Sequence, residues 1–363
     1  MPGILDPVTL LPTEYWHSLE DGRIQCDVCP RACKLREGQA GVCFVRARQD
    51  DQIVLTTYGR SSGFCVDPIE KKPLNHFLPG SAVLSYGTAG CNLACRYCQN
   101  WDISKSKEID TLADQASPER VAAAAVAYGC RSVAATYNDP VIFLEYADDV
   151  AQACHDVGVK AVAVTNGYVN PKARERLFAH MDATNVDLKS FDEDFYRHVC
   201  GAHLEPVLDT IEWLVHETDV WVELTTLVIP GHNDSDAELD ALATWVVEHV
   251  GPDVPLHLTA FHPDFRMLDV APTSRTSLVR ARDLAMDAGL HHVYVGNVHD
   301  AEGATTRCTS CGEVVVARRG YTISEYRLTD DGACRRCRGP LVGVFDGPVG
   351  AWGGGRLPVR LRR

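Results

Sequence analysis

The chain has 363 residues, a formal net charge of −14 and 45% hydrophobic residues. This length allows one large domain with small modules, or two domains, and the apolar fraction is ordinary for a globular protein. The negative charge argues against a general phosphate-binding surface, so we expect no nucleic-acid partner. We find no apolar run of about 18 residues and no leader peptide, so we expect a cytoplasmic protein that does not enter a membrane.

The first 60 residues contain the first of several cysteine clusters, with the spacing C-x2-C-x3-C-x9-C. Gly38 and Gly41 allow this short segment to fold back on itself. Four thiolates can hold a tetrahedral zinc ion, which would replace a missing hydrophobic core, or an iron–sulfur cluster. We expect a metal here and leave zinc and a second cluster as alternatives. The ligands are Cys26, Cys29, Cys33 and Cys43.

The stretch from Asp67 to Gly80 is dense in charge and proline, with the sequence DPIEKKPLNHFLPG. Such a stretch is expected to form neither a central strand nor a helix interior. It is either a loop over a functional site or a plain surface connector.

A second cysteine cluster has the spacing C-x3-C-x2-C and follows the apolar run 82–86. Its members are Cys91, Cys95 and Cys98. Three thiolates on one loop can hold three irons of a four-iron cluster and leave the fourth iron open for chemistry. The alternatives are a zinc knuckle that lacks a ligand, or three unrelated thiols.

Residues 82–297 alternate between apolar β-rich runs and helical stretches. Ser117 followed by proline predicts a helix start, residues 140–157 read as a helix, and Ser235 opens a capping box for a helix to about residue 250. The predicted strands are 132–136, 160–165, 185–188, 220–229, 256–261 and 292–295. Six to seven such βα units predict an α/β fold with parallel strands, a partial TIM-like barrel.

Polar side chains follow the predicted strands at their C-terminal ends. Because these ends meet at one edge of a parallel barrel, we expect a single shared mouth there. The residues are the three cysteines of the second cluster, Tyr137, Asn138, Asp139, Thr165, Asn166, Asp187, Lys189, Thr225, Thr226 and His262.

The C-terminal part carries the third cysteine cluster, two C-x2-C pairs separated by 22 residues. The members are Cys308, Cys311, Cys334 and Cys337. This spacing predicts a structural zinc ribbon with a small hairpin between the pairs, and a rubredoxin-like iron site is the alternative. The basic tail beyond residue 355 is expected to be a solvated end. The predicted divisions are 1–80, 81–300 and 301–363.

Four further cysteines lie outside the three clusters, at positions 65, 130, 154 and 200. In a chain without a predicted leader, clustered thiols indicate metal ligands before disulfides. Single thiols are more often small core residues or partly buried ones, which is what we expect of these four.

The segments GCNLACRYCQNWDIS and DPIEKKPLNHFLPGS resemble the radical S-adenosylmethionine (radical SAM) enzyme of the AmmeMemoRadiSam system. That family is similar to pyruvate formate-lyase activating enzymes. The similarity extends through TYNDP, VTNGYVN, VDLKSF, TTLVIPGHND, AFHPDF and VYVGN and includes both terminal cysteine sets. The resemblance implies a partial (β/α)6-type radical SAM barrel between an N-terminal four-cysteine region and a C-terminal zinc-ribbon-like module.

The resemblance also implies roles for single residues. The second cysteine cluster would bind a [4Fe-4S] cluster whose open iron takes S-adenosylmethionine. Tyr97 would lie beside the adenine and His262 near the adenosine. The methionine end would be held by Asn138, Asp139, Thr165, Asn166, Asp187 and Lys189. Ordinary hydrogen bonding at strand ends is the alternative for each residue that is not a cysteine.

The implied reaction is reductive cleavage of S-adenosylmethionine to a 5′-deoxyadenosyl radical, which abstracts a hydrogen atom from an unidentified substrate. A flavodoxin or ferredoxin would supply the electron. MEMO-type and AMMECR-type proteins are implied as partners by the family name. Two alternatives stay open. The first is an activase of glycyl-radical enzymes, and the second is a metal-bound interaction scaffold without catalytic activity.

Overall fold

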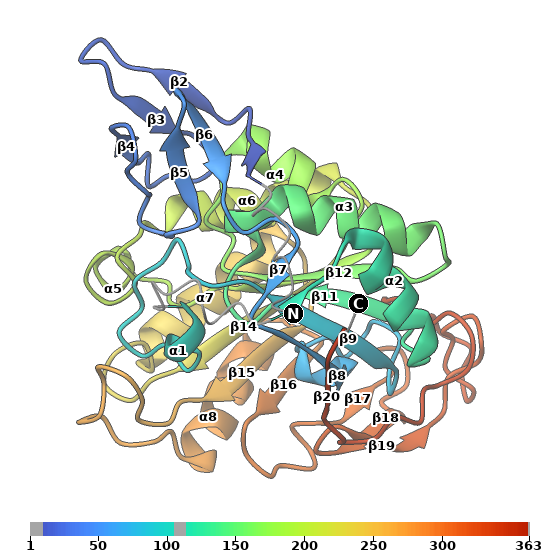
Figure 1. Cartoon of the computed structure of the whole chain (residues 1–363). Helices are drawn as coiled ribbons and strands as arrows, with labels where there is room; N and C mark the ends of the chain where they lie inside the picture. The colour runs from blue at the N-terminus through green and yellow to red at the C-terminus, as the bar shows by residue number, and fades with distance from the viewer. Residues whose placement is uncertain (1–9, 105–113, 362–363) are drawn as a thin grey trace.

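A computed structural model of the chain describes residues 10–104 and 114–361 (Figure 1). Within this range the central sheet has nine strands in the order β16-β15-β14-β13-β12-β11-β9-β8-β20. The strands are β8 (Gly63–Pro68), β9 (Ala82–Gly87), β11 (Ser132–Ala135), β12 (Lys160–Thr165), β13 (Ala183–Asp187), β14 (Trp221–Val228), β15 (Leu256–Ala260), β16 (Val293–Gly296) and β20 (Leu357–Val359). Within this sheet, β9 and β11 to β16 pair in parallel, which confirms the predicted α/β class with a mostly parallel sheet.

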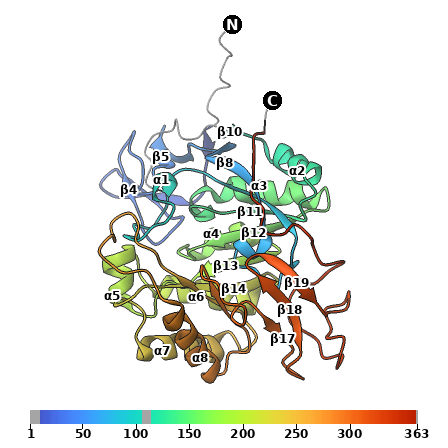
Figure 2. The same cartoon turned by 90° about the horizontal axis from the view of Figure 1, so that it is seen from below.

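Helices connect the parallel strands and lie around the sheet (Figures 1 and 2). They are α1 (Trp101–Ser104), α2 (Pro118–Ala127), α3 (Leu144–His155), α4 (Pro171–Phe178), α5 (Glu193–Phe195), α6 (Glu205–Glu217), α7 (Asp236–His249) and α8 (Arg275–Asp287), with short turns η1 (Ile69–Lys71), η3 (Pro140–Phe143) and η4 (Tyr196–Cys200). In the described residues, no helix is long and apolar enough to cross a membrane.

The predicted helix starts are present, with differences in detail. The Ser235 hydroxyl accepts the Glu238 amide, as a capping box requires. The Glu238 carboxylate, however, turns to the Phe191 amide and the Ser190 hydroxyl and so fastens α7 to the loop after β13. The helix predicted over 140–157 begins as the 3₁₀ turn η3, because the Asp139 carboxylate caps the Val141 amide one turn ahead of α3.

Strand β8 corrects the expectation that Asp67 and Pro68 lie outside a central strand. Both residues pair with β9, and β8 has β20 on its other side. Proline is tolerated because the pairing with β20 ends at Val66, so Pro68 has no partner strand on that side. The remainder of the stretch is buried rather than a surface connector: Lys72 is 3% exposed and His76 is fully buried.

The N-terminal region forms two small sheets, β1-β6-β5 and β2-β3-β4. Their strands are β1 (Leu11–Pro12), β2 (Trp16–Ser18), β3 (Ile24–Cys26), β4 (Lys34–Leu35), β5 (Arg46–Gln49) and β6 (Gln52–Leu55), and β7 (Arg60–Ser61) pairs separately with β10 (Asp114–Gln115). A fully buried ion pair joins this region to the barrel: Arg46 on β5 donates to both carboxylate oxygens of Glu145 on α3.

The C-terminal region adds a three-stranded sheet, β17 (Thr306–Arg307), β18 (Val314–Arg319) and β19 (Thr322–Tyr326), with its own small core. Strands β18 and β19 are the predicted hairpin. The N-terminal and C-terminal regions lie on opposite sides of the barrel in both views (Figures 1 and 2). The basic tail is not a purely solvated end, because β20 pairs with β8 in the central sheet.

Candidate functional site

A cavity of about 840 Å³ joins the predicted mouth to the interior of the barrel. This volume lies in the upper part of the range for small-molecule sites. Of the residues predicted for the iron–sulfur cluster and the cofactor, all but Thr165 and His262 line this cavity. The lining residues of this set are Cys91, Cys95, Cys98, Tyr97, Asn138, Asp139, Asn166, Asp187 and Lys189.

The loop with the three cysteines follows the C-terminal end of β9, and the N-terminal region packs directly on it. Gly90 has φ +87°, and a Cβ atom at this position would lie 1.9 Å from the Cys43 carbonyl oxygen. The Arg31 guanidinium donates to the Asn92 carbonyl at 2.8 Å. The start of the loop therefore requires a glycine, and the first cysteine region holds the loop in place.

Asn138 braces the same loop. Its side-chain amide donates to the Gly90 carbonyl at 2.9 Å, and its oxygen accepts the Thr88 amide at 3.3 Å. Asn166, directly after β12, also braces the loop: its side-chain amide donates to the Asn92 side-chain oxygen at 2.8 Å. Asn138 thus holds the backbone of the loop and Asn166 holds the Asn92 side chain, and both residues line the cavity.

Asp139 is buried and satisfied within the protein. Its carboxylate accepts the Asn166 amide at 2.7 Å, the Val141 amide at 3.0 Å and the Thr165 hydroxyl at 3.0 Å. Burial raises the pKa of Asp139 to about 6, although these hydrogen bonds oppose the shift. The Thr165 hydroxyl thus donates its hydrogen bond to Asp139, and Thr165 does not line the cavity. This carboxylate positions the ends of β11 and β12 relative to each other.

Asp187 and Lys189 form a charged pair at the end of β13, with 2.9 Å between Nζ and Oδ2. Burial lowers the pKa of Lys189, but the Asp187 carboxylate opposes this shift, and the net pKa lies well above the usual value. On the next strand, the Thr225 hydroxyl also lines the cavity and has no hydrogen-bond partner within the described residues. The pair and the hydroxyl offer opposite charges and an unused polar group to a zwitterionic ligand.

Tyr97 and His262 are placed differently. Tyr97 is buried, and its hydroxyl lies 3.6 Å from the Cys200 sulfur. The His262 side chain is 59% exposed and hydrogen-bonds to the Gln99 amide at 2.9 Å, so it contacts the cysteine loop from outside the cavity. Cys200 is buried, as are Cys65, Cys130 and Cys154, in agreement with the prediction for the cysteines outside the clusters.

Sequence reasoning missed the charged residues at the inner part of the cavity. Asp67, which is fully buried, accepts hydrogen bonds from Lys71 and Lys72 at 2.9 Å each and from the Tyr137 hydroxyl at 3.0 Å. Arg356, from the tail, lines the same space. The charge density of DPIEKKP was the only local signal, and it did not indicate which partners these residues would meet.

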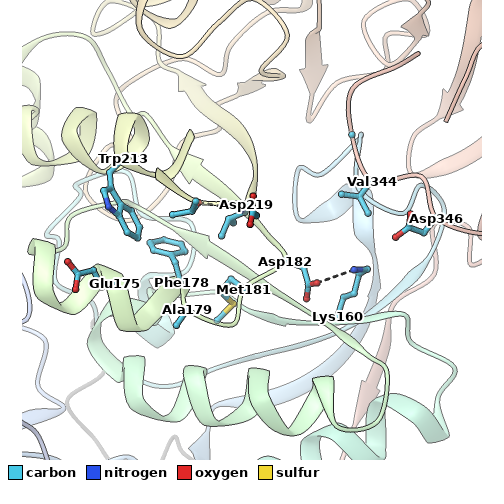
Figure 3. Close-up of a pocket in the computed structure, with 13 residues that line it drawn as sticks. Lys160, Glu175, Phe178, Ala179, Met181, Asp182, Trp213, Asp219, Val344 and Asp346 are labelled. Carbon is cyan, nitrogen blue, oxygen red and sulfur yellow. Dashed lines mark hydrogen bonds and ion pairs between the residues drawn. The ribbon is translucent and has the colours of Figure 1, made fainter. Parts of the chain in front are cut away.

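A second cavity of about 600 Å³ lies at the other end of the barrel (Figure 3). It is bounded by Lys160 at the start of β12, which pairs with Asp182 at 3.0 Å, and by Trp213 and Phe178. Because barrel chemistry is found at the C-terminal ends of the strands, this cavity is not the candidate active site.

The C-terminal cysteines converge around a single point. Sulfur–sulfur distances are 3.6 Å for Cys308 and Cys337 and 3.9 Å for Cys311 and Cys334. Four sulfurs about 2.3 Å from one tetrahedral zinc would stand about 3.8 Å apart, so this set fits one ion. In the described part of the chain, no other group of three or more potential ligands has all its ligand atoms within 4.8 Å.

The three loop cysteines fit a polynuclear centre by their chemistry and setting. In a four-iron cluster each thiolate binds a different iron, so the thiolates need not approach one another as they do around one zinc. The loop opens on a cavity large enough for a further ligand. The residues present therefore fit a [4Fe-4S] cluster with S-adenosylmethionine beside it.

Comparison with known proteins gives the same assignment. The family model described as radical SAM superfamily matches residues 85–243. An uncharacterised protein of Methanocaldococcus jannaschii is 36% identical over 324 residues, 89% of this chain and 96% of that protein. The benzylsuccinate synthase activating enzyme of Thauera aromatica is 31% identical over 126 residues, which are 34% of this chain and 38% of that enzyme.

Among solved structures, Streptococcus suis SuiB bound to S-adenosylmethionine aligns with a TM-score of 0.49 and 14% identity. The alignment covers 64% of this chain and 53% of that one. The radical SAM match begins in β9 and includes the cysteine loop and strands β11 to β14. Relatives named as activating enzymes match 34% and 44% of this chain. The chain belongs to the radical SAM superfamily and is a radical SAM enzyme, whose domain implies a [4Fe-4S] cluster and S-adenosylmethionine.

Proposed function

We propose that this chain is a radical SAM enzyme of the AmmeMemoRadiSam type that abstracts a hydrogen atom from a substrate in the barrel cavity. When bound, the [4Fe-4S] cluster and S-adenosylmethionine would supply the radical chemistry, with release of methionine and 5′-deoxyadenosine. The observation that carries the proposal is the meeting of three loop thiols with the Asp187–Lys189 pair in one cavity at the strand ends.

The chain's own residues would bind the cluster, orient S-adenosylmethionine and exclude water from the cavity. Cys91, Cys95 and Cys98 would ligate the cluster, on a loop braced by Asn138 and Asn166. An S-adenosylmethionine carboxylate suits the Lys189 ammonium and the amino group suits Asp187, because charge-assisted hydrogen bonds orient a zwitterion.

Two further residues would contact the nucleoside part of S-adenosylmethionine. Tyr97 would lie beside the adenine, and His262, held by Gln99, would close the outer rim near the adenosine. Asp139 and Thr165 would act by positioning, since their side-chain hydrogen bonds are to each other and to the backbone around them.

The remaining parts of the proposal concern organisation and partners. We take 1–80, 81–300 and 301–363 as functional divisions, with a zinc-ribbon-like module last and either zinc or a second cluster in the first. Zinc in the last module is supported by the sulfur–sulfur distances of 3.6 and 3.9 Å. A flavodoxin or ferredoxin would deliver the electron in the cytoplasm, and MEMO-type and AMMECR-type proteins are candidate partners.

A second candidate function is activation of a glycyl-radical enzyme by hydrogen abstraction from a backbone glycine. It is supported by the similarity to the activating enzyme of Thauera aromatica, which covers 34% of this chain. A glycine-bearing loop of the partner would then have to enter the cavity through its mouth.

The decisive experiment uses full-length protein reconstituted with iron and sulfide under anaerobic conditions. After reduction with dithionite and addition of S-adenosylmethionine, we expect 5′-deoxyadenosine in wild-type protein and none in Cys95→Ala. A Cys130→Ala variant is the matched control, because this thiol is buried in the core away from the cavity. No 5′-deoxyadenosine from the wild type would refute the proposed function.

A further inference from the structure

The cavity extends well below the cysteine loop, and its inner end is built from segments distant in sequence. The cysteines follow the end of β9 near Gly87, whereas Pro68 pairs with Ala82 at the start of this strand. Six residues of extended chain separate these two levels by about 16 Å. The turn after Pro68 therefore forms the floor of the barrel beneath the site at the strand ends.

Positive charge gathers at this inner end. Lys71 and Lys72 converge on the single carboxylate of Asp67. From the tail, the exposed residue Arg356 donates its Nε hydrogen to the Cys65 sulfur at 3.3 Å, and Cys65 and Asp67 lie two residues apart on β8. Alternate residues of a strand share a face, so all three cations surround one side of β8.

The neighbouring acid, Glu70, makes no ion pair with these cations within the described residues. One oxygen of Glu70 accepts the Gly80 amide at 2.7 Å and stands 3.8 Å from Arg318, whereas its second oxygen has no hydrogen-bond partner within the described residues. Three cations thus stand beside two carboxylates, and in the described part of the chain only Asp67 is ion-paired with any of them, to Lys71 and Lys72. A lysine offers three hydrogen-bond donors and an arginine five. Within the described residues, Lys71, Lys72 and Arg356 each use a single donor in a hydrogen bond.

These donors face the cavity that holds the thiols. Lys71, Lys72, Arg356 and the rings of Tyr137 and Tyr321 all line it. A partly enclosed space with excess positive charge favours an anionic ligand, because the attraction between opposite charges is stronger there than in water. The S-adenosylmethionine carboxylate already has a partner at the mouth in the proposed function, so the inner cations are left for a different molecule.

We infer that the substrate is a small oxyanion-bearing molecule, a carboxylate or a phosphate ester, whose charged end binds Lys71, Lys72 and Arg356 on the barrel floor. This inference rests on the proposed function and names its substrate class. The anionic end would sit beneath the reacting atoms, so that the hydrogen to be abstracted points toward the cysteine loop. A backbone glycine of a partner protein has no charge of its own to place there.

The test measures anion binding by isothermal titration calorimetry on reconstituted full-length protein. The probes are inorganic phosphate, succinate and the uncharged analogue succinamide, which separate phosphate, carboxylate and neutral ligands. We expect phosphate or succinate to bind more tightly than succinamide. Arg356→Gln and Lys71→Gln should each weaken that binding about ten-fold to hundred-fold, the usual range for a lost charge-assisted hydrogen bond.

The controls separate this inference from the proposed function. Arg360→Gln removes an exposed tail charge that does not line the cavity and should leave anion binding unchanged. S-adenosylmethionine affinity and iron content should be unchanged in Arg356→Gln, since the cations do not serve the cofactor.

Three results would overturn the inference: equal binding of succinate, phosphate and succinamide; equal anion binding in both variants and the wild type; or a parallel loss of S-adenosylmethionine affinity. Absence of 5′-deoxyadenosine with anion binding intact would instead refute the proposed function and leave the anion site standing.

Discussion

The buried ion pair between Arg46 and Glu145 offers a quantitative test of how the N-terminal region is held to the barrel. The two side chains are 2% and 1% exposed, and the guanidinium makes two hydrogen bonds to the carboxylate and a third to the Ile142 carbonyl at 3.0 Å. In an Arg46→Met variant the carboxylate stays buried and keeps the Thr13 hydroxyl as its remaining side-chain donor. Removal of one partner from such a pair costs about 3–5 kcal/mol.

The free energy of unfolding would be measured by urea titration, followed by circular dichroism and by tryptophan fluorescence. Coincident transitions justify a two-state treatment, and the shift in midpoint multiplied by the slope gives the loss. Arg197→Met is the matched control, because its ion pair with Glu193 is exposed and should contribute less than about 1 kcal/mol. The double variant Arg46→Met/Glu145→Leu should recover most of the loss, since no charge is left buried.

The dependence on pH gives a second check with a defined sign. In the wild type, burial raises the pKa of Glu145, but the ion pair with Arg46 outweighs it, and the net pKa is lowered. This stabilisation is present above the ordinary glutamate pKa and is lost as pH falls through the folded value. In Arg46→Met the unpaired carboxylate can be protonated. The loss in free energy of unfolding relative to the wild type should therefore become smaller as the pH falls. A loss below about 1 kcal/mol at pH 7, or no recovery in the double variant, would refute the reasoning.

Three further predictions concern the metal sites and the cavity. Cys311→Ser should lower the zinc content by about one equivalent and leave iron unchanged in elemental analysis; an unchanged zinc content would contradict a single four-thiolate ion. Lys189→Met should weaken S-adenosylmethionine binding about ten-fold in equilibrium dialysis, whereas Lys160→Met at the opposite end of the barrel should not; equal effects would argue against a carboxylate contact. Burial lowers the pKa of Lys72 to about 8, although Asp67 opposes this shift. Succinate affinity should therefore fall as pH rises through about 8, and a flat profile would show that Lys72 carries no charge that the anion uses.

Much of the barrel was predictable because the sequence patterns that indicate its strands and helices are local. Near-continuous apolar runs predicted the parallel strands, and β12 has the predicted bounds Lys160–Thr165. Helix starts followed from caps and prolines within a few residues. The cysteine spacing predicted the loop beneath which the cavity lies, and the C-x2-C pairs predicted thiols that do converge.

Elements that depend on distant partners were not predictable in this way. Strand β20 is three residues long and pairs with β8 about 290 positions earlier, so no pattern within either segment reveals the match. The same distance separates Arg356 from Cys65. The sequence pattern predicted a capping-box role for Glu238. In the structure its carboxylate instead accepts hydrogen bonds from the loop after β13.

The sequence by itself thus determined the βα order, the convergence of the C-terminal cysteines and the edge at which polar groups collect, because periodicity, caps and ligand spacing are short-range properties. Only the tertiary structure decided which charges share the cavity. A lysine-rich turn is expected at the surface, yet the fold buries Lys72 against Asp67 and brings Arg356 to the same cavity. Burial, and the electrostatics that follow from burial, belong to the packed chain and not to any segment of it.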